Sequence, residues 1–401
     1  MSRVHFYLLI LLFGVAQAVL FFKFGIVENV DSQRYLDWAL QPLSDISPTS
    51  WKFYSFSYLL ILSFFIKSGL GIAGLVLFQI SASLIACLLL YQLAINISGS
   101  KKTGLLAASL FILFGEIMLW NTYVLTESLF TSGIVWVMYL ISMAKSKKNW
   151  IICSIVVVFV ALIRPMGITV ILAFLLYLSI RFRPLATFSR QSKWAVVMGM
   201  LILAGVLITV LLEGNPSVNF YYSRGQIVWG TDSYLPNKWL RIDNSGVSYP
   251  PADQSSIGMF ATFVANNPTF FLELTFRKAI MFLLHIKPYH SIVHQLGTGI
   301  LLIISYLLSL SGFFSEKSHL KYFVLGLFLT NWILVSLSVE AYDGRFLVPL
   351  LPGLMLLASA KCQRILWKEP ESPEALSGLV NLGSLSVCWH LDHRTRFRSS
   401  S

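Results

Sequence analysis

The chain of 401 residues is 56% hydrophobic and only 12% charged, and its mean hydropathy is +0.72. Soluble domains carry about 25% charged residues, so this composition excludes a disordered chain and disfavours an ordinary soluble globule. The four cysteines have neither metal-type nor disulfide-framework spacing. The sequence therefore predicts an all-α, polytopic transmembrane helical bundle.

The formal net charge is +12. In a soluble protein such an excess of Lys and Arg would suggest nucleic-acid binding. Cytoplasmic loops of membrane proteins also collect basic residues, and the sequence has no basic–aromatic RNA-binding motif. We therefore expect membrane lipid, and not nucleic acid, as a partner.

A spanning helix needs about 20 predominantly apolar residues. The sequence predicts about ten such spans, several of them short or interrupted by Pro or Gly. In chain order they lie near 6–24, 71–95, 104–120, 123–143, 150–163, 167–180, 194–212, 291–312, 322–339 and 346–360. The first lacks a small-residue cleavage site, so we expect an uncleaved anchor.

The charges predict an orientation. With the N-terminus in the cytoplasm, every short inner loop is basic. Residues 1–360 then form the transmembrane domain, with long outer loops at 25–70 and 213–290, and 361–401 form a polar cytoplasmic tail. We expect an integral, multi-pass protein with an extracytoplasmic site, in a bacterial plasma membrane rather than the endoplasmic reticulum.

Three stretches of the outer loops have helical character. Residues 31–40 predict a short surface helix, and 53–71 are suited to lying in the membrane interface. Residues 269–286 are amphipathic and are expected to return along the membrane.

No P-loop, Rossmann glycine motif, HExxH or GxSxG motif is present. The candidates for chemistry are polar residues at the outer ends of spans. Asp31 follows the first span, and a partly desolvated carboxylate is a stronger general base. An N-cap of the following helix is the alternative role for Asp31.

Two further candidates lie at the outer ends of later spans. Glu127 is an ionisable residue at membrane depth, which normally faces a partner or a wet cavity; snorkelling to water or capping with Thr126 are the alternatives. Arg164 precedes the helix-breaking Pro165 and suits phosphate recognition, because it stays charged and presents a rigid fork of donors. An interface anchor is the alternative for Arg164.

The last outer turn holds Glu340, Asp343 and Arg345, with Gly344 supplying the bend. An internal ion pair between Arg345 and one of these acids is the alternative to a binding role. Two prolines after Arg345 are expected to kink the last span. Lys52, in the first outer loop, is a further cation near the interface.

His285, His290 and His294 cluster before the eighth predicted span. The last two are four residues apart, as helical metal ligands can be, but no acidic or Cys ligand is close in sequence. We expect interfacial histidines rather than a metal site. Glu116 is interpreted as an isolated buried acid that is hydrogen-bonded in the bundle or faces a cavity.

Taken together, five stretches resemble the GT-C superfamily of membrane glycosyltransferases, especially the protein O-mannosyltransferases and the lipid A aminoarabinose transferase. These stretches are DSQRYLDWAL (31–40), which includes Tyr35, WKFYSFSYLLILSFFIKSGLG (51–71), LTESLF (125–130), NNPTFFLELTFRK (266–278) and YDGRFLVPLLPGLMLLA (342–358).

The resemblance implies transfer of a sugar from a polyprenyl-phosphate donor to an acceptor hydroxyl of a protein, lipid or glycan. It implies Asp31 as general base. The implied substrate-binding residues are Lys52, Glu127, Arg164, Arg345, Glu340 and Tyr35. No cofactor is implied with certainty, although a divalent cation is compatible. The rival functions are a lipid-linked solute transporter or flippase, and a lipid-linked glycan polymerase or ligase.

Overall fold

The computed structural model describes residues 2–47, 50–182, 225–228, 240–251, 253–285, 290–338 and 344–366. Within these ranges the chain is helical, and two isolated β-bridges are the only extended pairing. The predicted all-α class is therefore confirmed for the described residues. The predicted span at 194–212, Glu340, Asp343 and the tail from 367 lie outside them.

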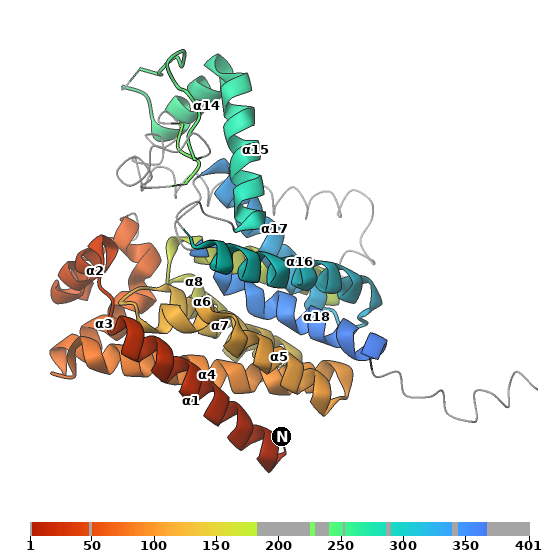
Figure 1. Ribbon diagram of the computed structural model, residues 1–401. Helices are drawn as coiled ribbons and strands as arrows, with labels where there is room; N and C mark the ends of the chain where they lie inside the picture. Colours follow the sequence, from red (N-terminus) through yellow and green to blue (C-terminus); the bar gives the residue numbers. More distant parts are fainter. Residues whose placement is uncertain are drawn as a thin grey trace, which may run out of the picture.

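The long helices pack into a bundle, from which α14 and α15 stand apart (Figure 1). The α-helices are α1 (Arg3–Phe24), α2 (Val30–Leu40), α3 (Phe56–Lys67), α4 (Gly71–Ser98), α5 (Lys101–Leu113), α6 (Gly115–Leu119), α7 (Glu127–Met143), α8 (Lys147–Ala161), α9 (Ile168–Arg181), α14 (Ser256–Asn266), α15 (Pro268–Leu284), α16 (Ile292–Ser315), α17 (Leu320–Leu337) and α18 (Leu351–Leu366). Short 3-10 helices are η1 (Leu43–Asp45), η2 (Trp51–Ser55), η3 (Trp120–Thr122), η4 (Pro165–Gly167) and η6 (Val348–Leu350).

Four of these helices, α1, α4, α16 and α17, are long and apolar enough to cross a membrane. A fifth candidate span is the bent pair formed by α5 and the segment Gly115–Thr122. Helices α7 and α9 are apolar but shorter. The described residues thus contain four or five candidate spans by length and composition, fewer than the ten predicted from the sequence.

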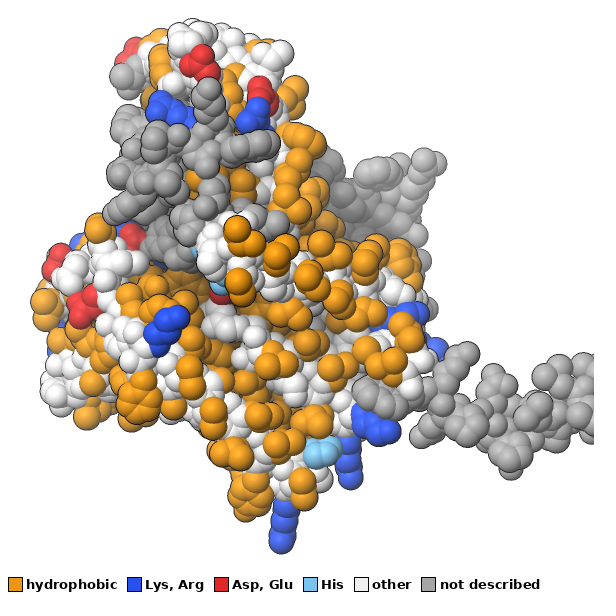
Figure 2. All heavy atoms as spheres, in the orientation of Figure 1, with side chains coloured by type: hydrophobic (Ala, Val, Ile, Leu, Met, Phe, Trp, Pro, Cys, Tyr) orange, Lys and Arg blue, Asp and Glu red, His pale blue; other side chains and the backbone are white. Residues whose placement is uncertain are grey.

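The faces of α1 and α16 that point away from the bundle are apolar. Only 17% of the most apolar window of each helix is buried within the protein, and large side chains such as Leu11 and Phe22 of α1 and Leu307 of α16 are exposed. Figure 2 shows many hydrophobic side chains, and few charged ones, on the surface of the bundle. A soluble monomer rarely exposes so large an apolar patch, whereas lipid covers it at no cost.

Helix α18 has the opposite character, because every residue from Leu351 to Ala360 is buried. Gly312 of α16 lies so close that an added Cβ would be 2.3 Å from the Leu357 carbonyl oxygen. Small residues allow such close helix packing in membrane proteins. Helix α18 therefore forms the centre of the bundle, packed against α16, α5 and α4.

The two prolines near the last predicted span begin that helix and do not kink it. Pro349 lies in η6 and Pro352 in the first turn of α18. Proline is tolerated in a first turn, because the amide that it lacks has no helical acceptor there. The helix continues to Leu366, past the predicted end at 360.

The predicted span at 104–120 is broken. The helix axis bends by 63° where α5 ends at Leu113 and the next segment begins at Gly115. Phe114 leaves the helical conformation with ψ 85°, so the break places Glu116 at the start of a new short helix. The next predicted span begins four residues late, at Glu127, because 123–126 are not helical.

The first outer segment forms the predicted surface helix, α2. Asn29 caps α2 through a reciprocal pair of hydrogen bonds with Ser32. Asn29 thus takes the N-cap role considered for Asp31, which lies in the first turn of α2 with its side chain largely buried. Helix α3 covers most of the stretch predicted to lie in the interface.

The described part of 225–285 has its own small core. Ile227 and Leu240 flank a bridge between Gln226 and Arg241 and pack with Phe271 of α15. The predicted amphipathic helix forms as α15, which runs across the direction of α16 in Figure 1. This part of the second outer loop is thus a structured unit.

Candidate functional site

Buried amides fix the chain that leads into Glu127. The Gln79 Nε2 donates to two backbone carbonyls of the loop at 3.1 and 2.8 Å. Within that loop, the Asn121 Nδ2 donates to Gln17 Oε1 at 2.9 Å, and Ser128 Oγ donates to Asn121 Oδ1 at 2.6 Å. Because these groups are buried, breaking one bond leaves a polar atom without water. The loop therefore holds the first turn of α7 in a defined place.

The same loop also holds the start of α2. Val27 N donates to Thr122 O and Val124 N donates to Val27 O, both at 3.0 Å. This isolated parallel bridge joins the segment between α1 and α2 to the residues just before α7. It brings Asp31, in the first turn of α2, beside Glu127, in the first turn of α7.

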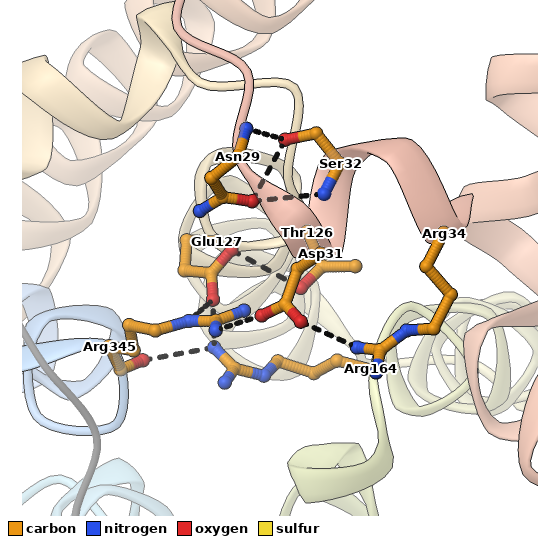
Figure 3. Close-up of polar contacts among 8 residues, drawn as sticks. All are labelled: Asn29, Asp31, Ser32, Arg34, Thr126, Glu127, Arg164 and Arg345. Atoms are coloured by element: carbon orange, nitrogen blue, oxygen red, sulfur yellow. Dashed lines mark hydrogen bonds and ion pairs between the residues drawn. The ribbon is translucent and has the colours of Figure 1, made fainter. Parts of the chain in front are cut away.

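Four predicted side chains meet here, and we call them the four-residue ion cluster: Asp31, Glu127, Arg164 and Arg345 (Figure 3). The Arg345 guanidinium joins both carboxylates, with Nε 2.5 Å from Glu127 Oε1 and one terminal nitrogen 2.5 Å from Asp31 Oδ2. Arg164 lies 3.6 Å from the same Glu127 oxygen and donates to the Arg345 carbonyl at 2.9 Å. Segments far apart in the sequence thus converge on one point.

The cluster is nearly closed to solvent. The exposed fraction of the Glu127 side chain is 0% and that of Arg345 is 11%. Buried ions are tolerated only when they are paired and hydrogen-bonded. The buried charge of each residue in the cluster is therefore compensated by the opposite charges of its neighbours. Glu127 therefore does not snorkel to water, and Arg164 is not an interface anchor.

A third arginine lies at the edge of the four-residue ion cluster. Arg34 of α2 approaches the other Asp31 oxygen at 2.8 Å and is half-exposed. With Arg34 included, the described residues bring three arginines to two carboxylates. Planar guanidinium groups bind phosphate oxygens through paired hydrogen bonds. The arrangement is thus suited to accepting an anion.

Aromatic rings hold Arg164 in place. Its guanidinium carbon lies 5.5 Å from the centre of the Phe130 ring and 5.2 Å from that of Phe346. Cation–π contacts of this kind are worth on the order of 1 kcal/mol and orient the planar group. Arg164 thus remains directed toward Glu127 and Arg345.

Two other predicted site residues lie outside the cluster. Lys52 donates to Gln41 Oε1 at 2.6 Å and lies 5.7 Å from the centre of the Trp38 ring. Tyr35 is buried and packs edge-on against Tyr58, with ring centres 5.2 Å apart. Sequence reasoning overlooked Tyr58, whose buried hydroxyl has no hydrogen-bond partner among the described residues.

The structure corrects the interpretation of Glu116 as isolated. Its Oε2 lies 2.6 Å from His285 Nε2, and its Oε1 lies 2.9 Å from His294 Nε2. We call these three residues the Glu116–histidine group. His290 packs edge-on against His294, with ring centres 4.4 Å apart. The absence of a nearby acid in the sequence was misleading, because Glu116 is supplied by a distant helix.

Among the described residues, no set of three His, Cys, Asp or Glu side chains could hold a metal ion. The carboxylate of Glu116 instead accepts hydrogen bonds from both imidazoles. No protein-family model matches the chain, and no curated protein matches it significantly. The arguments about function therefore depend on the geometry of these residues.

Proposed function

We propose that this protein is an integral-membrane glycosyltransferase of the GT-C type. It transfers a sugar from a polyprenyl-phosphate donor to an acceptor hydroxyl on the extracytoplasmic face. The observation that carries the proposal is the Arg345 guanidinium, held between Asp31 and Glu127 in a group of charged side chains that is nearly closed to solvent. This places a candidate base beside candidate phosphate ligands.

The ends of the helices support the proposed side of the membrane. The N-terminal ends of α1 and α5 carry Arg3, Lys101 and Lys102, and the C-terminal end of α18 carries Arg364. These ends lie together, at the opposite end of the bundle from α2 (Figure 1). Basic residues favour the cytoplasmic side, so Asp31 would face the extracytoplasmic side.

The chemistry assigns a role to each charge. The acceptor oxygen attacks the anomeric carbon while Asp31 takes the hydroxyl proton, a contribution of about 10²–10⁴-fold. The bond from the anomeric carbon to the phosphate oxygen breaks, and the lipid phosphate leaves with the electron pair. Arg345 and Arg164 stabilise the charge that develops on it. Before the donor binds, the two carboxylates serve as counterions for these arginines.

The test is transfer of labelled sugar from polyprenyl-phosphate donors by membranes that contain the purified chain. We expect Asp31→Asn to lower the turnover rate by about 10²–10⁴-fold, because an amide cannot accept the proton. Asp37→Asn is the matched control, since Asp37 is an exposed carboxylate on the same helix. Normal transfer by Asp31→Asn would remove Asp31 as the base.

One observation favours a second candidate, a transporter. Broken helices near buried ionisable residues are typical of transporters, and the 63° break after α5 places Glu116 next to two histidines. Solute or lipid translocation by reconstituted vesicles separates the two functions. A transporter would lose activity in Glu116→Gln and release its substrate unmodified, whereas the glycosyltransferase would form a new glycosidic bond.

A further inference from the structure

We propose that the Glu116–histidine group is a positioning device for Arg345, and that it acts through Gly344. This inference rests on the proposed glycosyltransferase function, because it takes Arg345 as the ligand of the donor phosphate. The positioning itself follows from contacts among segments that are far apart in the sequence.

The first contact is between His285 and the turn before Arg345. Gly344 has φ 64°, a left-handed conformation that favours glycine. A Cβ at this position would lie 1.8 Å from the Cε1 of His285 and 2.5 Å from its Nδ1. The imidazole ring is thus pressed against the backbone of Gly344 and forms one wall of the turn.

The second step is that this imidazole is itself held. His285 is buried, and its Nε2 lies 2.6 Å from Glu116 Oε2. His285 also adopts φ 53°, the only positive φ outside glycine in the described residues. His285 ends α15 in this left-handed conformation, which fixes where its imidazole leaves the helix. His294 fixes the other oxygen of Glu116 at 2.9 Å.

The third step leads from the turn to the guanidinium. Leu347 N donates to Gly344 O at 3.0 Å, which closes the turn around Arg345. The Arg345 carbonyl accepts a hydrogen bond from Arg164. A shift of the turn would therefore move both the guanidinium and the position of Arg164. A misplacement of about 1 Å at a reacting site can cost about 10²-fold in rate.

The experiment measures amide hydrogen exchange in residues 344–350 and the kinetics of sugar transfer in parallel. His285→Asn removes the ring but keeps a residue that tolerates positive φ. We expect exchange at 344–350 to rise about tenfold or more, and kcat to fall about 10–100-fold. Glu116→Gln keeps one acceptor oxygen, so its effect is expected to be smaller.

The matched control is His5→Asn, which removes one long-range hydrogen bond, from His5 Nδ1 to the Tyr91 hydroxyl at 2.9 Å. His5 lies near the N-terminal end of α1, whereas the site follows its C-terminal end. Exchange at 344–350 and kcat should remain unchanged in this variant. Loss of protection throughout the protein, instead of at 344–350, in His285→Asn would indicate a structural role alone and overturn the proposal.

Unchanged exchange at 344–350 in His285→Asn would also overturn the positioning role. Increased exchange in a protein whose wild type transfers no sugar would keep the positioning role and reject the proposed function. If His285→Asn does not fold, Gly344→Asn, which tolerates the positive φ, is compared with Gly344→Asn combined with His285→Gly. Relief of the exchange defect by the second change supports contact between ring and turn, and the absence of relief overturns it.

Discussion

Helix α2 carries charged residues in two very different environments. On one face, Asp31 belongs to the four-residue ion cluster, which is nearly closed to solvent. One turn further along the helix, Arg34 is 46% exposed and lies 5.4 Å from the centre of the Trp38 ring, which Lys52 also approaches. Both environments contain ion pairs between an arginine and a carboxylate. The free energy that such a pair contributes depends on how far burial has removed its charges from water. The predictions below test this difference.

The largest effect on stability is expected at Glu127. Glu127→Ala leaves the guanidinium groups of Arg164 and Arg345 buried without their shared carboxylate. Removing one partner of a buried ion pair typically costs about 3–5 kcal/mol. Denaturant unfolding in detergent measures this loss.

The matched control for Glu127→Ala is Glu273→Ala, because Glu273 pairs with Arg277 on the surface of α15 at 2.5 Å, with both side chains over 40% exposed. Exposed helix pairs contribute about 0.3–0.5 kcal/mol. Equal losses in the two variants would contradict the proposed contrast between buried and exposed charges.

A buried lysine should make stability depend on pH. Lys278 of α15, which is not a candidate span, is fully buried and donates to Ser338 O at 2.5 Å. Burial lowers the pKa of Lys278 from 10.5 to about 7. Between these pH values the unfolded chain binds more protons than the folded one, so stability rises with pH.

Lys278→Met should remove this dependence. The gain in unfolding free energy over wild type is expected to be several kcal/mol below pH 7 and to vanish above pH 10.5. Unfolding curves at several pH values provide the measurement. A constant difference between the two proteins across this range would show that Lys278 keeps its charge when folded.

The smallest effect is expected on the exposed face of α2. Arg34→Ala removes one ion pair with Asp31 at 2.8 Å, but Arg345 still holds the other carboxylate oxygen at 2.5 Å. The loss should be about 0–1 kcal/mol, as for other surface pairs. The same unfolding assay measures it, and a loss as large as that in Glu127→Ala would show that Arg34 is part of the buried cluster.

Much of the candidate site could be predicted, because charges in apolar segments are few and must find partners. Asp31, Glu127, Arg164 and Arg345 were each recognised as polar residues at the outer ends of predicted spans. Alternating topology places all such ends on one side of the membrane. The structure brings these four together, although it leaves Lys52 outside the cluster.

The partner of Glu116 could not be read from local spacing. His285 and His294 follow Glu116 by 169 and 178 residues, and sequence neighbours say nothing about such contacts. The same topological rule could have found them, since Glu116 ends one predicted span at the outer side and the histidines begin another there. The break at Phe114 was also missed, because the apolar pattern continues through it.

The burial of α18 on all sides has a consequence for biogenesis. Arg345 and α18 leave the ribosome after Asp31, Glu127 and Arg164, so a nascent chain that ends at Ser338 contains two carboxylates of the cluster but only one of its two arginines. Synthesis of the segment that contains Arg345 and α18 supplies the guanidinium that joins both carboxylates and fills the centre of the bundle. Completion of the charged cluster and of the helix packing is thus a single late event in biogenesis.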